Sequence, residues 1–409
     1  MSRRVVIVGG GAAGFFGAIA CAERAPGAEV LILEKTAQVL QKVRISGGGR
    51  CNVTHACFDP RELTQSYPRG EKELLGPYHQ FQAEDTVRWF ESRGVKLKAE
   101  PDGRMFPITD SSETIIRCLL READKLGVQV RVNSAVNSIE KRPEGFLVND
   151  LESNCVLLAT GGCRSAALGA LAVSLGHSLV APVPSLFTFH IDAGWLRDLA
   201  GLTVATVELT LPGTRLSSRG PVLFTHWGLS GPAILRLSAW GARTLSEMNY
   251  RFPLRVNWIP GLTLTDIERH ARAEGGKLAV NSPIPPLPSR LGQALLALAG
   301  IPREKRWSAV GRAEQGRLLE VLSATQLEVT GKSLNKDEFV TCGGVALSEV
   351  KFKTMESKIS PGLYFAGELL DIDGITGGFN FQAAWTTGWI AGRSMAKVLQ
   401  ASPRTDERA

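Results

Sequence analysis

The chain has 409 residues, of which 44% are hydrophobic and 21% charged, as in an ordinary soluble enzyme of two or three domains. Its net charge of +7 is compatible with a polyanionic partner, but it is also common in basic enzymes that bind only a cofactor. None of the seven cysteines forms a Cys-x-x-Cys pair, which argues against a zinc ribbon or a dithiol redox centre. Their odd number and the lack of a recognisable leader predict a cytoplasmic protein, and no metal site is expected.

The first predicted unit is a strand, a tight turn, a helix and a second strand. A β-branched run, residues 5–8, leads into the motif Gly9-x-Gly11-x-x-Gly14, and the second strand ends in the acidic Glu34. Gly9 allows the turn, Gly11 lets a pyrophosphate approach the backbone, and Gly14 lets the helix pack closely on the strand. Glu34 can accept hydrogen bonds from ribose hydroxyls. This segment therefore predicts a dinucleotide site.

The uncharged run of residues 5–22 follows Arg3 and Arg4 and could instead be a signal peptide or a membrane span. Three successive glycines and the immediate return to a strand argue against both. We therefore expect no membrane segment here.

The region after Glu34 reads as the rest of a first domain. Residues 42–52 (KVRISGGGRCN) form a glycine-rich basic loop, and residues 103–107 (GRMFP) a turn into a short strand. The other expected elements are helices at 71–98 and 112–126 and strands at 128–132, 135–140, 145–148 and 156–159. The last strand closes on Thr160-Gly161-Gly162.

The pattern then changes twice. Strand-like runs separated by Gly and Pro predict a β-rich insert, and residues 262–325 look helical around a proline cluster at 281–289. From Phe339 the chain returns to strands and turns. The expected domains are a dinucleotide-binding domain (1–187 and 336–409) interrupted by a β-rich domain (188–260) and a helical subdomain (261–335).

The C-terminal segment, residues 362–385, indicates which dinucleotide is bound. Glu368 follows a short strand and could bind a ribityl hydroxyl, and Gly377 and Gly378 allow backbone N–H groups to approach the flavin N1–C2=O edge. A helix from about Asn380 would aim its positive end at that edge, where reduced flavin holds negative charge. An ordinary helix cap and turn is the alternative. The segment favours FAD, because a plain NAD domain has no use for it.

Seven ordered motifs resemble the BaiN/RdsA-type (YhiN-like) FAD-dependent oxidoreductases. They are VVIVGGGAAG, KVRISGGGRCN, GRMFP, LLATGG, FTHWGLSGPAIL, TCGGVAL and GLYFAGELLDIDGITGGFNFQAAW. The resemblance implies an α/β fold, a Rossmann-like FAD-binding domain of the two-dinucleotide-binding-domain type, with an inserted β-barrel-like domain and a small helical domain. It also implies that Val136 contacts the adenine through its backbone. The cofactor-binding residues expected from these motifs are Gly9, Gly11, Ala12, Ala13, Gly14, Glu34, Lys35, Lys42, Ser46, Gly47, Gly48, Arg50, Cys51, Asn52, Val136, Thr160, Gly161, Gly162, Gly367, Glu368, Asp373, Gly377, Gly378, Phe379, Asn380 and Ala383.

Two residues are candidates for catalysis. Cys51 could protonate the carbon next to the one that accepts hydride, although a buried cysteine is usually a packing residue. His226 could act as an acid or base or contact the substrate, or Thr225 and His226 could fix a turn while residues 228–232 start a helix.

Three functions fit these features. The first is reduction of an activated C=C bond with NADH or NADPH as transient reductant; the resemblance points to uridine in large-subunit ribosomal RNA or to unsaturated 3-oxo steroids. The second is a flavin amine oxidase; it would need a cage for a neutral amine, and the presence of only four tyrosines in the chain argues against one. The third is a non-enzymatic factor in which FAD is a structural element. Because the chain has one complete G-x-G-x-x-G motif, we expect the nicotinamide to use the same flavin face as the substrate, which predicts ping-pong kinetics.

A basic cluster in the helical insert favours ribosomal RNA over a small-molecule substrate. Its cations lie beside Trp307, and a basic stripe with an aromatic residue is typical of RNA backbone binding and base stacking. A solvated helix face is the alternative. The cluster consists of Arg303, Lys305, Arg306, Arg312 and Arg317.

Overall fold

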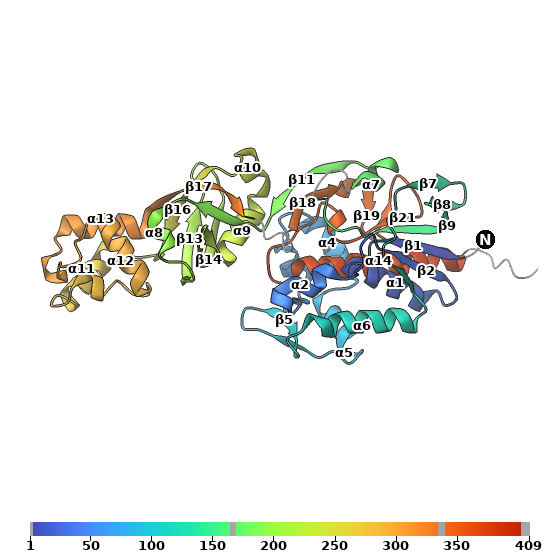
Figure 1. Cartoon of the computed structure of the whole chain (residues 1–409), viewed down its shortest axis with the longest axis horizontal. Helices are drawn as coiled ribbons and strands as arrows, with labels where there is room; N and C mark the ends of the chain where they lie inside the picture. The colour runs from blue at the N-terminus through green and yellow to red at the C-terminus, as the bar shows by residue number, and fades with distance from the viewer. Residues whose placement is uncertain (1–2, 164–168, 334–339, 402–409) are drawn as a thin grey trace, which may run out of the picture. The chain divides into compact units, whose positions relative to one another are not determined.

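The computed structural model describes residues 3–163, 169–333 and 340–401 and divides into two compact units. Unit 1 comprises Met1–Pro184 and Lys336–Ala409, and unit 2 comprises Ser185–Asn335. Figure 1 labels their helices and strands. Each unit has its own hydrophobic core.

Unit 1 is built on a seven-stranded sheet in the order β19-β20-β21-β10-β1-β2-β6. Its five-strand parallel part pairs β1 with both β2 and β10, which places Val8 beside Leu33 and Leu158. The β1 burial pattern shows four consecutive buried residues, as expected for a parallel strand covered on both faces. The strands are β1 (Arg4–Val8), β2 (Glu29–Leu33), β6 (Gln129–Arg131), β10 (Cys155–Leu158), β19 (Val350–Lys351), β20 (Glu356–Ser357) and β21 (Leu363–Phe365).

Two helices that are far apart in sequence pack closely in unit 1. These are α1 (Ala12–Arg24) and the long C-terminal α14 (Phe379–Ala401). A Cβ on Gly388 would lie 2.4 Å from the Ala13 carbonyl oxygen, and one on Gly392 would lie 2.2 Å from that of Gly17. Only glycine permits this backbone approach. The contact joins the middle of α14 to the first turn of α1, which follows the glycine motif.

The remaining elements of unit 1 surround this layer. One three-stranded sheet consists of β3 (Thr54–His55), β4 (Leu97–Ala99) and β5 (Arg104–Pro107). A second consists of β7 (Ile139–Arg142), β8 (Gly145–Val148) and β9 (Leu151–Ser153). A two-stranded sheet pairs β11 (Leu179–Ser185) with β18 (Val340–Val345). The other helices are α2 (Gln41–Gly49), α3 (Pro60–Thr64), α4 (Glu71–Tyr78), α5 (Ala83–Glu91), α6 (Ser112–Lys125) and α7 (Ala170–Ser174).

Unit 2 contains a closed six-stranded barrel in the order β12-β15-β14-β13-β16-β17. Buried and exposed residues alternate along its strands, so one set of side chains fills the interior. The barrel strands are β12 (Thr188–Ile191), β13 (Thr203–Thr210), β14 (Ser217–Thr225), β15 (Gly228–Ser230), β16 (Phe252–Asn257) and β17 (Thr325–Ser333). The helices of unit 2 are α8 (Gly194–Arg197), α9 (Pro232–Trp240), α10 (Ala242–Glu247), α11 (Leu264–Ala273), α12 (Ser289–Leu298) and α13 (Arg312–Ala324).

Three expectations differ from the structure. The loop expected at residues 42–52 begins later, because residues up to Ile45 belong to the helix α2, whereas Ser46 and the glycines after it depart from helical dihedral angles. Residues 228–230 form β15, and the helix begins only at Pro232. Residues 325–333, which fall within the expected helical subdomain, instead form β17, which pairs with β12 and β16 and closes the barrel.

Across the described ranges, no helix is both long and apolar enough to span a bilayer.

Candidate functional site

The carboxyl ends of four parallel strands bring together the main predicted residues of unit 1. Gly9 follows β1, Glu34 follows β2, Thr160 comes after β10, and Glu368 comes after β21. Parallel strands end at the same edge of a sheet, and open α/β sheets bind ligands outside that edge. The fold therefore gathers segments of sequence that lie more than 300 residues apart.

The turn after β1 has the geometry that its glycines predict. Gly9 has φ 111°, and a Cβ there would lie 2.4 Å from the Ala159 carbonyl oxygen. A Cβ on Gly11 would have no atom within 4 Å, so this backbone stays accessible from outside. Thr160 Oγ1 lies beside the turn, buried and without a hydrogen-bond partner in the described structure. A phosphate oxygen suits such a hydroxyl donor and the N-terminus of α1.

Glu34 is held in place by backbone and hydroxyl donors. Its Oε2 accepts from the Gly10 N–H at 2.8 Å, and its Oε1 accepts from the N–H and the hydroxyl of Thr36. The Ser134 N–H donates to the Glu34 carbonyl at 2.8 Å, which brings the chain just before Val136 to this position. Lys35 is exposed. The arrangement orients a carboxylate next to the glycine turn.

The glycine-rich segment at the end of α2 is a backbone kink. Gly47, Gly48 and Gly49 all have positive φ, and Cβ atoms on Gly48 and Gly49 would meet no atom within 4 Å. The Ser46 carbonyl closes the kink by accepting from the Cys51 N–H at 3.0 Å. Successive backbone N–H groups in such a turn can form a concave site that suits anions.

Cys51 and Arg50 differ sharply in environment. Cys51 is fully buried, and burial raises its pKa to about 12, so the thiol holds its proton strongly. The structure thus gives Cys51 a packing role, and its acid role stays a prediction. Arg50 pairs with Glu100 at 2.7 Å, and its guanidinium lies 4.0 Å from the Phe106 ring centroid.

Lys42 and Glu368 form an ion pair that joins α2 to the segment after β21. The other carboxylate oxygen of Glu368 accepts from the Thr341 N–H at 3.0 Å. A Cβ on Gly162 would lie 2.5 Å from the same oxygen. The pair therefore stands beside the Gly161-Gly162 turn after β10, and Gly161 itself has φ 79°.

The loop before α14 is fixed from within and from outside. The Asn380 side chain accepts from the Gly374 N–H at 2.8 Å and donates to the Gly374 carbonyl at 2.9 Å. Asp373 is fully buried and pairs with Arg69. With its amide oriented to satisfy its neighbours, Asn52 accepts from the Gly378 N–H at 2.9 Å. The Gly378 N–H expected to face flavin is thus directed to Asn52 in this structure.

Two residues that the sequence reasoning missed hold the same loop. His55 Nδ1 lies 3.0 Å from the Gly377 carbonyl oxygen, and its ring stacks on Phe379 with centroids 4.6 Å apart. The Tyr67 hydroxyl donates to the Phe379 carbonyl at 2.5 Å. His55 follows the GGGRCN motif by three residues, so its closeness to an already suspected loop was the available signal.

The remaining predicted residues of unit 1 lie in the packed contact of α1 with α14. The Gly367 N–H donates to the Thr387 hydroxyl at 2.9 Å, and a Cβ on Gly367 would lie 2.9 Å from the Ala13 Cβ. Ala12 is partly exposed and Ala383 is buried. These small residues let α14 pack closely against the first turn of α1, which follows the glycine turn.

His226 belongs to unit 2 and lies exposed in the turn between β14 and β15. The Thr225 hydroxyl donates to the Gly228 carbonyl at 3.1 Å and accepts from the Trp227 N–H at 3.3 Å. Thr225 therefore fixes the turn. Trp227, the residue after His226, is 65% exposed.

The predicted stacking role of Trp307 was wrong. Trp307 is 1% exposed, and its indole N–H donates to the Ser282 carbonyl at 2.9 Å. Lys305 pairs with Glu314 at 2.6 Å, and Arg317 donates to the Ala299 carbonyl. Large aromatic side chains usually pack into the core, so Trp307 is buried although basic residues stand next to it in the sequence.

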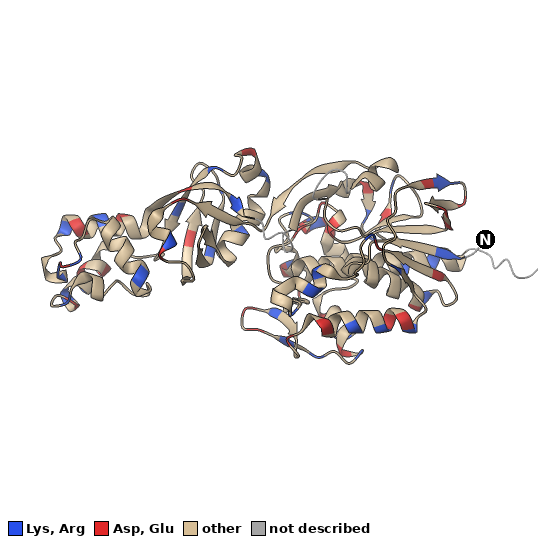
Figure 2. Ribbon diagram, in the orientation of Figure 1, with Lys and Arg blue, Asp and Glu red and all other residues tan. Residues whose placement is uncertain are grey.

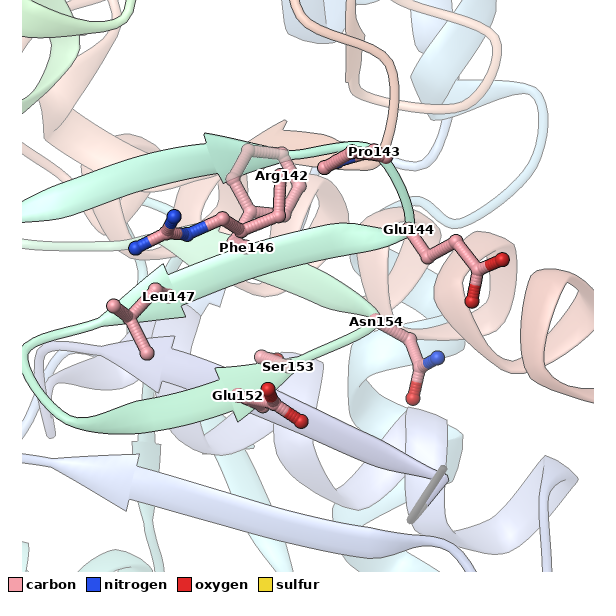
Figure 3. Close-up of a pocket in the computed structure, with 8 residues that line it drawn as sticks. All are labelled: Arg142, Pro143, Glu144, Phe146, Leu147, Glu152, Ser153 and Asn154. Atoms are coloured by element: carbon pink, nitrogen blue, oxygen red, sulfur yellow. The ribbon is translucent and has the colours of Figure 1, made fainter.

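A cavity of about 470 Å³ in unit 1 lies away from this arrangement (Figure 3). Its lining includes Arg142, Glu144 and Glu152, and Asn154 at its rim accepts from the Arg4 N–H at 2.9 Å. Asn154 precedes β10, whereas Thr160 comes after that strand. The cavity is therefore at the amino end of the sheet and not at the carboxyl edge where ligands bind.

The family model described as HI0933-like protein Rossmann domain matches residues 3–394. The chain belongs to the HI0933-like family. The predicted family and the Rossmann-type fold with an inserted barrel are thereby confirmed.

Two curated relatives of this HI0933-like protein are enzymes. The ribosomal RNA dihydrouridine synthase of Escherichia coli (strain K12) is 31% identical over 95% of this chain and 97% of its own length. The 3-dehydro-bile acid delta(4,6)-reductase of Clostridium scindens is 29% identical over 97% and 99%. These relatives bear out the prediction of an oxidoreductase.

A solved structure shares the fold. The 3-ketosteroid-delta4-(5alpha)-dehydrogenase from Rhodococcus jostii RHA1, in complex with 4-androstene-3,17-dione, has a TM-score of 0.51 and 15% identity. The match covers 96% of this chain and 97% of that one.

Proposed function

We propose that this protein is an FAD-dependent oxidoreductase that reduces an activated C=C bond with NADH or NADPH, and that its substrate is uridine in large-subunit ribosomal RNA. The observation that carries the proposal is the gathering of Gly9, Glu34, Thr160 and Glu368 at the carboxyl edge of one parallel sheet. These groups are a backbone turn, a hydrogen-bond acceptor for ribose, a hydrogen-bond donor for a phosphate and a second hydrogen-bond acceptor. Together they match the parts of a dinucleotide in order.

The residues present fit FAD. The glycine turn and the α1 N-terminus would take the pyrophosphate, with the Thr160 hydroxyl supplying a donor that has no protein partner in the described structure. Glu34 would accept from the ribose, and the backbone near Val136 would meet the adenine. Lys42 and Glu368 would lie toward the ribityl chain. When bound, FAD supplies hydride transfer between a nicotinamide and the substrate.

The protein's own contribution to the reaction is orientation and charge. The N-terminus of α14 and the ammonium group of Lys42 provide positive potential at the carboxyl edge of the sheet. His55, Tyr67 and Asn380 fix the loop before α14, so that its backbone groups are already oriented. Such groups need no reorganisation when charge develops.

The substrate follows from the relatives and from charge. The Escherichia coli relative is named a ribosomal RNA dihydrouridine synthase, and a polyanionic substrate suits a chain with a net charge of +7. The reaction consumes one nicotinamide hydride and one solvent proton and saturates the C5–C6 bond of uridine. The second candidate is an unsaturated 3-oxo steroid, which the bile-acid reductase relative favours at 29% identity.

The deciding experiment is nucleoside mass spectrometry of ribosomal RNA from a strain that lacks this protein. We expect one dihydrouridine to disappear and to return with the intact gene. Gly11→Ala should not restore it, because the added methyl group would meet no protein atom but would stand where the pyrophosphate approaches. Gly76→Ala, on α4, is the matched control, because its Cβ also meets no atom within 4 Å.

An unchanged dihydrouridine profile, with FAD bound to the purified protein, would overturn the RNA substrate. It would direct the search to 3-oxo steroids, assayed by loss of enone absorbance with NAD(P)H. A purified protein that takes up no FAD would overturn the proposal altogether.

A further inference from the structure

The positive charge of the chain is concentrated in unit 2. Residues 185–335 hold 17 Lys and Arg against 11 Asp and Glu, whereas the rest of the chain holds 30 against 29. Within unit 2, residues 201–258 of the barrel and its helices hold six arginines against two glutamates. Figure 2 shows these charges along the ribbon. The excess that made RNA an expected partner is therefore a property of the insert.

Most cations of the helical part are engaged by a partner, although Arg303 is exposed and has no carboxylate within ion-pair distance among the described residues. Arg269 and Arg272 pair with Asp266 and Glu268 on their own helix, and Lys277 pairs with Glu274 at 2.7 Å. In the predicted RNA cluster, Lys305 and Arg312 lie within ion-pair distance of Glu314 and Glu268, and Arg306 donates to the Gly276 carbonyl. This part of the surface has little free positive charge to offer.

Four arginines of the barrel have a different environment. Arg219 on β14 and Arg255 on β16 point outward, because Ser218 and Leu254 beside them are buried. Arg215 lies in the turn between β13 and β14, and Arg251 directly precedes β16. All four are exposed, and none has a carboxylate within 4 Å among the described residues.

These four arginines lie around one patch of three adjacent strands. In the register, Arg219 faces Glu208 and Arg255 faces Thr210, both on β13. Two strand spacings, about 10 Å, therefore separate the strands that carry Arg219 and Arg255. The carboxylates of this face are Glu208, which accepts from Asn257 at 3.4 Å, and Glu328 on β17 opposite Pro253. The arginines outnumber them.

An exposed aromatic residue lies beyond the end of the same strand. On β14 the outward positions run through Arg219, Pro221 and Leu223, and the turn that follows presents Trp227 with 65% of its surface exposed. Its ring stacks on His190 with centroids 6.3 Å apart, which orients it. Exposed guanidinium groups contact phosphates, and an exposed indole can stack on an unpaired base.

We propose that the outer face of β14, β13 and β16, with Arg215, Arg219, Arg251, Arg255 and Trp227, is the surface that contacts the sugar-phosphate backbone and an unpaired base of the RNA substrate. The proposal rests on the proposed function for its substrate class. It moves the expected RNA contact from the helical subdomain to the barrel, because the four barrel arginines lack carboxylate partners, whereas Lys305 and Arg312 of the helical cluster have them.

The test compares two double variants of equal charge in the full-length holoenzyme. Arg219→Gln with Arg255→Gln removes two barrel cations, and glutamine avoids the repulsion from Glu208 that a glutamate would bring. Arg269→Gln with Arg272→Gln removes two exposed, paired cations of α11 and is the control. Binding of a large-subunit ribosomal RNA transcript is measured at several salt concentrations.

We expect the barrel pair to weaken binding at least tenfold and to lower the slope of log affinity against log salt by about 1.5, as for two lost phosphate contacts. The α11 pair should stay within twofold of the unmodified protein. Trp227→Ala should weaken binding without changing the slope, because stacking releases no counterions. Equal losses of RNA affinity in the two double variants, or no loss in the barrel variant, would overturn the proposed RNA-binding surface.

Failure of the surface and failure of the proposed function can be distinguished in the same preparations. FAD content and NAD(P)H oxidation should be unchanged in both double variants, because neither pair belongs to unit 1. A protein without FAD that still binds RNA through the barrel would overturn the oxidoreductase proposal alone. A flavoprotein that reduces a small enone but does not bind the transcript would overturn the surface.

Discussion

Lys42 and Glu368 form an ion pair across 326 residues of sequence. The pair joins α2, after the first βαβ unit, to the segment after β21 in the returning part of the chain. Because Glu368 also accepts from the Thr341 N–H, its carboxylate is oriented before any ligand arrives. This relationship makes the cofactor site a property of the folded sheet edge.

Lys42→Gln should weaken FAD binding at least tenfold, about 1.4 kcal/mol, because the variant removes the ammonium group beside Glu368. Stability should change by less than about 1 kcal/mol, since Lys42 is 42% exposed. Arg44→Gln, on the same helix but paired with Glu113 at the surface, is the control. Fluorescence titration of the apoprotein with FAD measures the affinity of each variant. Equal FAD affinities of the Lys42→Gln and Arg44→Gln variants would contradict the assignment.

His55→Ala should release the Gly377 carbonyl and lower the rate of substrate reduction more than tenfold, while FAD stays bound. Glutamine can place an amide donor near the same carbonyl, so His55→Gln should recover part of the rate. The flavin reduction potential should shift in His55→Ala, where the loop is released, and should return toward the value of the unmodified protein in His55→Gln. A structural role without influence on the flavin would leave the potential unchanged.

Cys51→Ala should preserve substrate reduction to within about threefold while FAD remains bound. Burial raises the pKa of Cys51 to about 12, so the thiol is a weak acid at neutral pH and the pH–rate profile should show no limb that depends on it. The cavity left by the sulfur should cost about 1 kcal/mol of stability. A loss of a hundredfold in rate with FAD retained would instead establish Cys51 as the proton donor.

His177 should make stability depend on pH. Its ring nitrogens lie 3.0 Å from the Glu349 carboxylate and 2.8 Å from the Ser357 hydroxyl, and burial lowers its pKa below the ordinary 6.5. As the pH falls below about 6.5, the unfolded chain takes up the proton first, so the free energy of unfolding decreases. In His177→Gln this decrease should vanish from chemical denaturation measured between pH 5 and 7. An identical slope in the variant would refute the assignment.

The nucleotide turn was predictable because its signal is local. The β-branched run, the three glycines and Glu34 lie within 30 residues, and each acts through its own backbone or the next turn. The same holds for β13 and β16, whose alternation of apolar and polar residues is read from neighbours two positions apart.

Contacts between distant segments could not be predicted in this way. Nothing near His55 in the sequence indicates that its ring meets Gly377, and Trp307 lies among cations in the sequence but inside the core in space. A run of basic residues likewise indicated an RNA contact in the helical insert, where Glu314 and Glu268 in fact pair with Lys305 and Arg312.

The sequence by itself therefore determined the family, the dinucleotide turn and most elements of both units. The site as a set of neighbouring groups depended on the parallel order β21-β10-β1-β2, which brings Gly9, Glu34, Thr160 and Glu368 to one edge. The physical reason is that helices, strands and turns arise from interactions over a few residues. Strand order and side-chain pairing are instead set by the packing of segments hundreds of residues apart.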